Sequence, residues 1–199
     1  TLPIPSAEAL AHSQKLALLI QERISQNGGW LSFADFMGMA LYEPGLGYYS
    51  GGAKKFGLGG DFVTAPEMSP LFAQTLARQA AQVLAETQGD ILELGAGTGK
   101  LAADMLLTLQ ALNRLPARYY ILEVSAHLRQ VQLETLQASL PEHVIQRVMW
   151  LDSLPMQFIG LIVGNEVLDA IPVHLIYNTE SDLSERGVAF DHGFIWQDR

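Results

Sequence analysis

The chain has 199 residues, of which 49% are hydrophobic and 17% are charged, a length and composition that exclude a disordered or fibrous protein. Acidic residues outnumber basic ones by 21 to 12, and the net charge of −9 argues against nucleic acid as a partner. The chain has no cysteine, which excludes disulfides, thiol nucleophiles and cysteine-bound metals.

The N-terminal part has the pattern of two helices. Ser6 can cap the first helix, and the glycines after Asn27 end it. Ser32 and Asp35 fit a capping box for a second helix, which reaches about Leu41.

A glycine-rich stretch and a third helix come next. Seven glycines lie between residues 45 and 60, a density that indicates a mobile loop or a loop that approaches a ligand closely. The following segment, 61–67, mixes aromatic, hydroxyl and acidic residues, unlike a plain flexible linker. Ser69 and Pro70 then begin a helix that runs to about Thr87.

From residue 89 onward, apolar strands alternate with helices. Strands are predicted at 91–94, 119–124, 144–150 and 159–163, helices at 100–113 and 126–140, and short final strands at 175–177, 188–190 and 194–196. This alternation predicts βαβ units and a parallel sheet, and therefore an α/β fold. We expect residues 1–88 to form an N-terminal helical part with the glycine-rich loop, and 89–199 to form a partial Rossmann-like core.

The most specific motif is the loop Glu93–Gly99, which contains Gly95, Gly97 and Gly99 between a buried strand and a helix. An ATP-binding P-loop is excluded because Leu101 stands where a Ser or Thr is needed, and a dinucleotide loop fits poorly because Lys100 replaces its third glycine. The loop matches the acid-x-Gly-x-Gly-x-Gly pattern of S-adenosylmethionine sites in full. Glu93 would suit the cationic end of that cofactor, whereas it would repel a pyrophosphate.

Two further acids follow the next two strands. Glu123 is expected to accept hydrogen bonds from the ribose hydroxyls of the cofactor. Asp152 is expected to contact the adenine amino group, with a role as a turn or cap residue as the alternative.

A polar segment after the fourth strand is the candidate acceptor site. Asn165, Glu166 and Asp169 would line it, and one helical turn would put both carboxylates on the same face. Two carboxylates and an amide suit a guanidinium or amine, although acids in a first helical turn also serve as caps. His174 could accept a proton, but a structural histidine is the alternative. No metal site is expected, because the 5 histidines show no ligand spacing.

Five segments in order resemble the MidA family, a bacterial and mitochondrial group that includes the complex I assembly-factor arginine methyltransferase. They are ALYEPGLGYYS, FGLGGDFVTAPEMSPLF, ILELGAGTGKLAADML, YYILEVSAHLRQ and GNEVLDAIPVH. The resemblance implies a class I, Rossmann-like methyltransferase sheet with an N-terminal helical cover and S-adenosyl-L-methionine as cofactor. It also implies that Gly60, Asp61, Thr64 and Glu67 pack over the cofactor.

The resemblance further implies a protein substrate that carries an arginine, of the respiratory complex I type, with Asn165, Glu166 and Asp169 on the substrate side. Members of the family are far longer, so we expect an N-terminal fragment or a short form without the C-terminal strands. The chain shows no signal peptide and no membrane-spanning segment, which predicts the bacterial cytoplasm, or the mitochondrial matrix for a eukaryotic homologue. Two alternatives stay open: a non-catalytic assembly factor that binds the cofactor, and a nicotinamide-dependent oxidoreductase.

Overall fold

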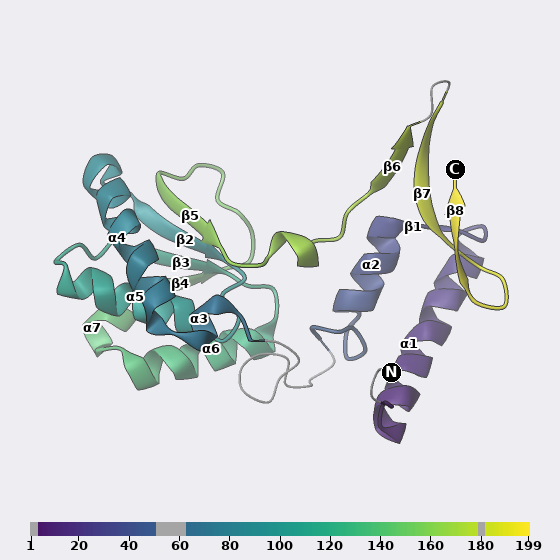
Figure 1. Ribbon diagram of the computed structural model, residues 1–199, viewed down its shortest axis with the longest axis horizontal. Helices are drawn as coiled ribbons and strands as arrows, with labels where there is room; N and C mark the ends of the chain where they lie inside the picture. The colour runs from purple at the N-terminus through teal and green to yellow at the C-terminus, as the bar shows by residue number, and fades with distance from the viewer. Residues whose placement is uncertain (1–3, 51–62, 179–181) are drawn as a thin grey trace. The chain divides into compact units, whose positions relative to one another are not determined.

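The computed structural model describes residues 4–50, 63–178 and 182–199, and the chain forms two compact units (Figure 1). Lys54–Val167 make up one of them, the parallel-sheet unit. Thr1–Ala53 combine with Leu168–Arg199 in the other, the antiparallel-sheet unit. The sequence predicted a division between residues 88 and 89. The structure groups the chain differently, because the strands after residue 175 pair with the N-terminal segment.

Four parallel strands form the sheet of the parallel-sheet unit, in the order β4-β3-β2-β5. The strands are β2 (Asp90–Leu94), β3 (Tyr119–Leu122), β4 (Val148–Leu151) and β5 (Gly160–Gly164). Leu92 of the inner strand β2 is in register with Tyr120 on one side and Ile162 on the other. The predicted parallel sheet is therefore confirmed. Figure 1 shows the four arrows pointing the same way, so the carboxyl ends share one edge.

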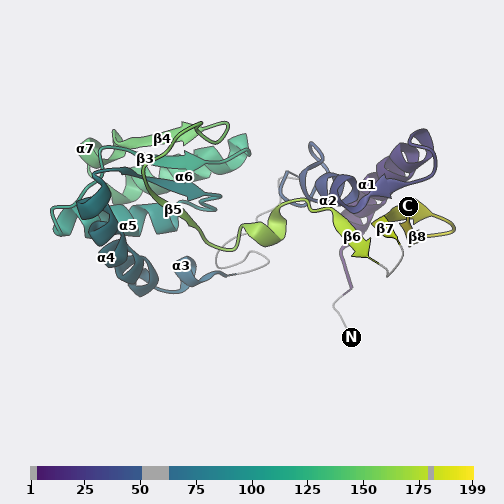
Figure 2. The ribbon, with the colours of Figure 1, turned by 90° about the horizontal axis from the view of Figure 1, so that it is seen from above.

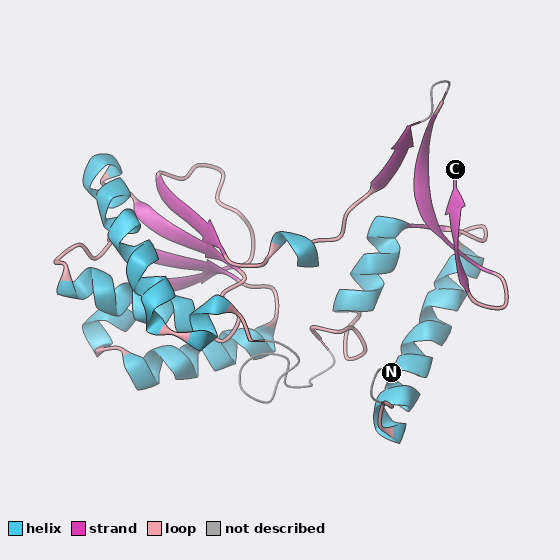
Figure 3. Ribbon diagram, in the orientation of Figure 1, coloured by secondary structure: helices cyan, strands magenta, loops and turns pink. Residues whose placement is uncertain are grey.

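The helices of this unit are α3 (Ala65–Met68), α4 (Pro70–Thr87), α5 (Lys100–Ala111), α6 (Ala126–Ser139) and α7 (Glu142–Ile145), drawn in cyan in Figure 3. Helix α4 begins after Ser69, with Pro70 in its first turn as predicted, and the Ser69 Oγ caps it by accepting the Leu71 N–H at 3.2 Å. Ala73, Ala77 and Ala80 lie fully buried on one stripe of α4. Their small side chains let α4 pack closely against α5 in the core of the unit.

The strand predicted over 144–150 is wrong in its first half. Residues 142–145 form the short helix α7, and β4 begins only at Val148. The Val144 N–H donates to the Pro141 carbonyl, and the Val144 side chain is fully buried from this helical turn. A short apolar run can be buried by a helix or by a strand, so its periodicity could not separate the two.

The antiparallel-sheet unit contains α1 (Ala7–Gln26), β1 (Leu31–Ser32), α2 (Phe33–Tyr42), the 3₁₀ turn η1 (Leu168–Ala170), β6 (Leu175–Asn178), β7 (Leu183–Phe190) and β8 (Phe194–Asp198). Both predicted caps are confirmed. Ser6 Oγ accepts the Ala9 N–H at 3.1 Å, and Ser32 Oγ accepts the Asp35 N–H at 3.0 Å.

Strand β7 is the centre of the second sheet and pairs antiparallel with β1, β6 and β8. The two-residue strand β1 was not predicted, because it is too short to show an alternating pattern. The core of this unit joins helices and strands through Ile20, Ile24, Leu31, Met39 and Val188. Figure 2 shows α1 and α2 along one side of the strands. The helices of the expected N-terminal cover thus pack with the late strands in one unit.

Gly187 makes the pairing of β1 with β7 possible. A Cβ at this position would lie 2.1 Å from the Leu31 carbonyl oxygen and 2.4 Å from Cε2 of Trp30. We therefore expect Gly187→Ala to lower the free energy of unfolding by about 1–3 kcal/mol, measured by urea denaturation. Gly193→Ala is the matched control, because a Cβ there would meet no atom within 4 Å. Equal stability of the two variants would contradict this account.

Candidate functional site at the carboxyl edge of the parallel sheet

The strand order of the parallel sheet reverses at β2. The chain builds outward from β2 through β3 to β4, and then returns to place β5 on the other side of β2. At such a reversal of strand order, the connections on the two sides of β2 diverge and leave room for a ligand. The loop that follows β2 is the glycine loop Gly95–Gly99.

All three glycines of the loop have left-handed backbone angles, with φ of 59° at Gly95, 55° at Gly97 and 84° at Gly99. Only glycine adopts this region without strain. A Cβ on Gly99 would lie 3.1 Å from the Cα of Gln132, so helix α6 approaches the loop closely. A Cβ on Gly97 would meet no atom within 4 Å, so the loop backbone at this point borders open space.

Glu93 lies in the core beneath the loop. Its side chain is 2% exposed, and its Oε2 accepts the Tyr119 hydroxyl at 2.7 Å. Burial raises the pKa of Glu93 to about 7, although the hydrogen bond from Tyr119 opposes the shift. Burial and the neighbouring Glu93 together raise the pKa of Tyr119 well above its ordinary value. The predicted interaction of Glu93 with a cationic group stays a prediction.

Glu123 directly follows β3 and is 6% exposed. Its Oε1 accepts the Ser125 N–H at 2.9 Å, and its Oε2 accepts Nε2 of Gln132 at 3.0 Å. The carboxylate is therefore held from two sides at the carboxyl edge of the sheet, where the sequence analysis expected it.

Arg129 ties the ends of β3 and β4 together. Its Nε donates to the Glu123 carbonyl at 2.7 Å, and one terminal nitrogen donates to the Leu151 carbonyl at 2.8 Å and to the Asp152 carboxylate at 2.7 Å. The Asp152 side chain is 92% exposed. The carboxylate predicted to contact adenine is thus an accessible group that Arg129 orients.

Glu67 connects helix α3 to the glycine loop. Its carboxylate accepts a hydrogen bond from the Thr98 hydroxyl. Thr64 lies at the start of α3, and its carbonyl accepts the Glu67 N–H at 2.9 Å. Of the four residues expected to cover the cofactor, Glu67 contacts the loop and Thr64 supports Glu67, whereas Gly60 and Asp61 fall outside the described residues.

The segment after β5 does not form the helical turn expected for Glu166 and Asp169. Asn165 and Glu166 lie in a bend, Glu166 has a left-handed φ of 51°, and the 3₁₀ turn begins only at Leu168. The expectation of a shared helical face is therefore wrong, because the backbone at Glu166 cannot start a right-handed helix. The Val167 side chain would lie 3.3 Å from a Cβ on Gly95, so this segment contacts the glycine loop.

Asp169 and the tyrosines of the antiparallel-sheet unit lie near each other. The rings of Tyr42 and Tyr49 stack at 5.5 Å, and the Tyr42 hydroxyl donates to the Ala170 carbonyl at 2.8 Å. Burial raises the pKa of Tyr49, and the charge of Asp169 raises it further.

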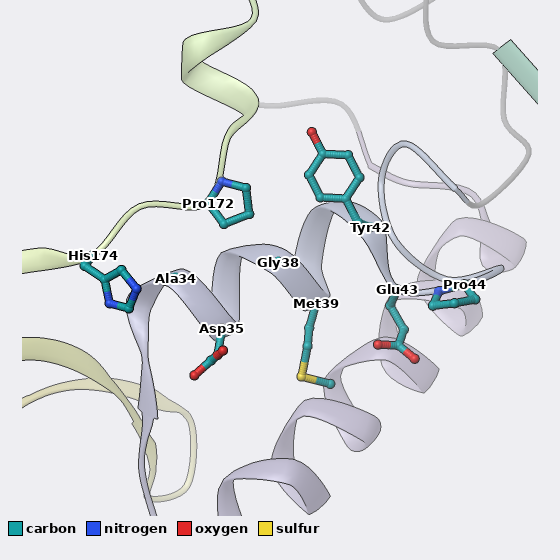
Figure 4. Close-up of a pocket in the computed structure, with 9 residues that line it drawn as sticks. All are labelled: Ala34, Asp35, Gly38, Met39, Tyr42, Glu43, Pro44, Pro172 and His174. Atoms are coloured by element: carbon teal, nitrogen blue, oxygen red, sulfur yellow. The ribbon is translucent and has the colours of Figure 1, made fainter. Parts of the chain in front are cut away.

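A groove of about 500 Å³ runs along α2 in the same unit. Figure 4 shows Asp35, Met39 and Glu43 leaving one side of the helix, with Pro172 and His174 on the segment that passes it. Among the described residues, no lysine or arginine lines this groove. His174 Nδ1 lies 2.6 Å from Oε1 of Glu185, an ion pair when His174 is protonated.

Within 4–50, 63–178 and 182–199, no three His, Asp or Glu side chains gather as they would around a metal ion. Among the helices of those same ranges, none has the length and apolar character needed to span a membrane.

Gln132, Tyr119 and Arg129 were not identified from the sequence. Each acts through a hydrogen bond to a residue at least six positions away. The one available signal was Gln132 itself, a polar residue four positions before Leu136 on the buried stripe of a helix.

Known proteins are similar to this chain in sequence and in fold. Residues 75–198 match the family described as "Putative S-adenosyl-L-methionine-dependent methyltransferase". A crystal structure of a likely methyl transferase from Burkholderia thailandensis, bound to S-adenosyl-homocysteine, is 50% identical with a TM-score of 0.89, over 100% of this chain and 53% of that one.

Two curated relatives are mitochondrial proteins named protein arginine methyltransferase NDUFAF7 or its homolog. The Danio rerio protein is 30% identical over 82% of this chain and 44% of its own length. The Caenorhabditis elegans protein is 29% identical over 90% of this chain and 46% of its own length. The chain thus spans about half the length of these relatives.

The buried Glu93 predicts a pH dependence of stability. Because the pKa is about 7 in the folded chain and near its ordinary value of 4.5 in the unfolded chain, the folded state keeps a proton that the unfolded state releases between these values. The free energy of unfolding should therefore fall as the pH rises from about 4.5 to 7, by on the order of 3 kcal/mol, and level off above.

Urea denaturation of the wild type and of Glu93→Gln at pH 5, 6, 7 and 8 tests this expectation. The amide cannot ionise, so the variant should lack this part of the slope, and the difference between the two curves isolates the contribution of Glu93. Parallel curves would show that Glu93 does not titrate in this range.

Proposed function

The chain belongs to this family of S-adenosyl-L-methionine-dependent methyltransferases, and from that membership we propose that it binds S-adenosyl-L-methionine and methylates an arginine on a protein. The chain has the α/β methyltransferase fold, as its TM-score of 0.89 to the Burkholderia thailandensis structure shows. The matches also confirm the resemblance to the MidA family. The observation that carries the proposal is the glycine loop beside Glu123 at the carboxyl edge of the sheet, in a chain 50% identical to a structure that holds S-adenosyl-homocysteine.

The residues present fit such a cofactor. The open space beside Gly97 allows a ligand to lie against bare backbone. Each oxygen of the Glu123 carboxylate receives one protein donor and keeps a lone pair for a ribose hydroxyl. We assign Asp152 to the adenine and Gly60, Asp61, Thr64, Glu67, Glu93, Gly95, Gly97 and Gly99 to the surrounding site. When bound, the cofactor supplies a methyl group on a positively charged sulfur.

Asn165, Glu166 and Asp169 are assigned to the substrate side. A carboxylate holds a planar guanidinium by parallel charged hydrogen bonds, which aligns one nitrogen for attack. The carboxylates are weak bases compared with arginine, so they orient the nitrogen and stabilise its charge while the proton leaves late. Alignment of this kind can supply roughly 7–11 kcal/mol of the barrier reduction.

The groove along α2 supports a cationic protein substrate. Asp35 and Glu43 lie two helical turns apart on its lining, and the part of the lining that the structure describes holds no lysine or arginine. A basic segment would find complementary charge there. The names of the mitochondrial relatives support arginine as the acceptor, and a respiratory complex I subunit remains the proposed type of target. The bacterial origin of the 50% identical structure supports a cytoplasmic location.

The role of Glu123 can be tested by binding of the cofactor product. Calorimetric titration with S-adenosylhomocysteine should give micromolar binding, and Glu123→Ala should weaken it at least about tenfold, because two hydrogen bonds to a carboxylate are lost. Glu134→Ala, which removes an exposed carboxylate of α6, is the matched control and should bind normally. Preferential binding of NAD would instead support the oxidoreductase alternative.

The roles of Glu166 and Asp169 can be tested by the rate of methyl transfer. Glu166→Gln and Asp169→Asn should each slow the appearance of methylarginine in an added protein extract by about 100-fold, because the acceptor nitrogen loses its alignment. Both variants should still bind S-adenosylhomocysteine, and Asp191→Asn, at an exposed acid, should keep full activity. Mass spectrometry of the extract measures the product. A wild type that binds the cofactor and methylates nothing would support the non-catalytic assembly factor.

A further inference from the structure

Gln132 joins three segments at the carboxyl edge of the parallel sheet. It lies on α6, and its side chain is completely buried. Its Nε2 donates to the Gly97 carbonyl at 3.1 Å and to Oε2 of Glu123 at 3.0 Å. Its Oε1 accepts the indole N–H of Trp150 at 2.8 Å. One side chain therefore contacts the glycine loop, the end of β3 and strand β4.

The orientation of this amide is fixed by its partners. The indole nitrogen of Trp150 can only donate, so the amide oxygen must face it. The amide nitrogen then faces the Gly97 carbonyl and the Glu123 carboxylate, which can only accept. Both hydrogens and the oxygen are used, and no buried polar atom of Gln132 is left without a partner.

Packing alone does not account for an amide at this position. A methionine has nearly the same length and would fill the space without the cost of burying polar atoms. What only the amide provides is a pair of donors, one for the loop carbonyl and one for Glu123. The backbone of α6 also contacts the loop here, since a Cβ on Gly99 would lie 3.1 Å from the Cα of Gln132. The backbone of Gln132 therefore lies directly against the loop.

We propose that Gln132 is a positioning residue that fixes the Glu123 carboxylate for the two ribose hydroxyls of the cofactor. The proposal rests on the function proposed above. With Ser125 N–H on one oxygen and Gln132 on the other, Glu123 cannot rotate, and its two remaining acceptor positions are set for vicinal hydroxyls. The same fixed charge disfavours a phosphate on the ribose. Gln132 therefore acts on the ribose through the orientation of Glu123, without contacting it.

The test compares two ligands by calorimetry on the 199-residue chain. One is S-adenosylhomocysteine, and the other is its analogue in which both ribose hydroxyls are replaced by hydrogen. Gln132→Met should weaken binding of the first by about tenfold and change binding of the second by less than about twofold, because only the first uses the aligned carboxylate. In the Glu123→Ala background, Gln132→Met should have no further effect.

Gln130→Met is the matched control, because it makes the same change on the exposed side of α6 and should leave both affinities unchanged. If Gln132→Met does not fold, as judged by circular dichroism, Trp150→Phe keeps Gln132 but removes the donor that orients it. That variant should weaken binding of S-adenosylhomocysteine selectively, by about threefold.

Equal losses for both ligands would overturn the proposal, since they indicate a general disruption of the site. Unchanged binding of S-adenosylhomocysteine by both Gln132→Met and Trp150→Phe would overturn it as well, while leaving the proposed function intact. A wild type that binds neither ligand would overturn the proposed function and this inference together.

Discussion

The close approach of α6 to the glycine loop is the constraint on which the rest of the candidate site depends. A side chain at position 99 would contact the backbone at Gln132, so glycine is required there, and the left-handed turn it adopts brings the loop against the helix. With the helix at this distance, Gln132 reaches both the loop and Glu123, and Arg129, three residues earlier on the same side of α6, reaches the ends of β3 and β4. The loop, two strand ends and a carboxylate thus depend on one contact between helix and loop.

The two buried carboxylates of this region are held in opposite ways. Glu123 receives two donors and stays at the edge of the sheet, where a ligand can use its remaining lone pairs. Glu93 receives one donor, from Tyr119, inside the core, and burial raises its pKa to about 7. Burial disfavours the charged form of this carboxyl, which is why its pKa lies above the ordinary value. The difference arises from position along the strands, since Glu93 lies within β2 whereas Glu123 follows the last residue of β3.

The antiparallel-sheet unit adds features that the parallel sheet lacks. Its strand β7 joins the first and last parts of the chain in one sheet, and Gly187 allows that pairing because Leu31 and Trp30 leave no room for a side chain. The same unit carries the acidic groove along α2 and the stacked tyrosines near Asp169.

The sequence by itself determined the parallel α/β unit, the glycine loop, the order of Glu123 and Asp152 after it, the caps at Ser6 and Ser32, and the start of α4 at Ser69 and Pro70. These features depend on local periodicity and turn chemistry, which a few neighbouring residues specify.

Only the tertiary structure decided that Gln132 holds Glu123, that Tyr119 holds Glu93, and that the late strands pair with the N-terminal segment. Gln132 lies 35 positions from Gly97, and β1 lies far from β7 in the chain. Such contacts form only when the elements pack, so no local pattern records them. At Glu166 a local pattern was misleading. The three-residue spacing of Glu166 and Asp169 suits a helix, but Glu166 has a left-handed backbone after β5, which prevents a helical turn there.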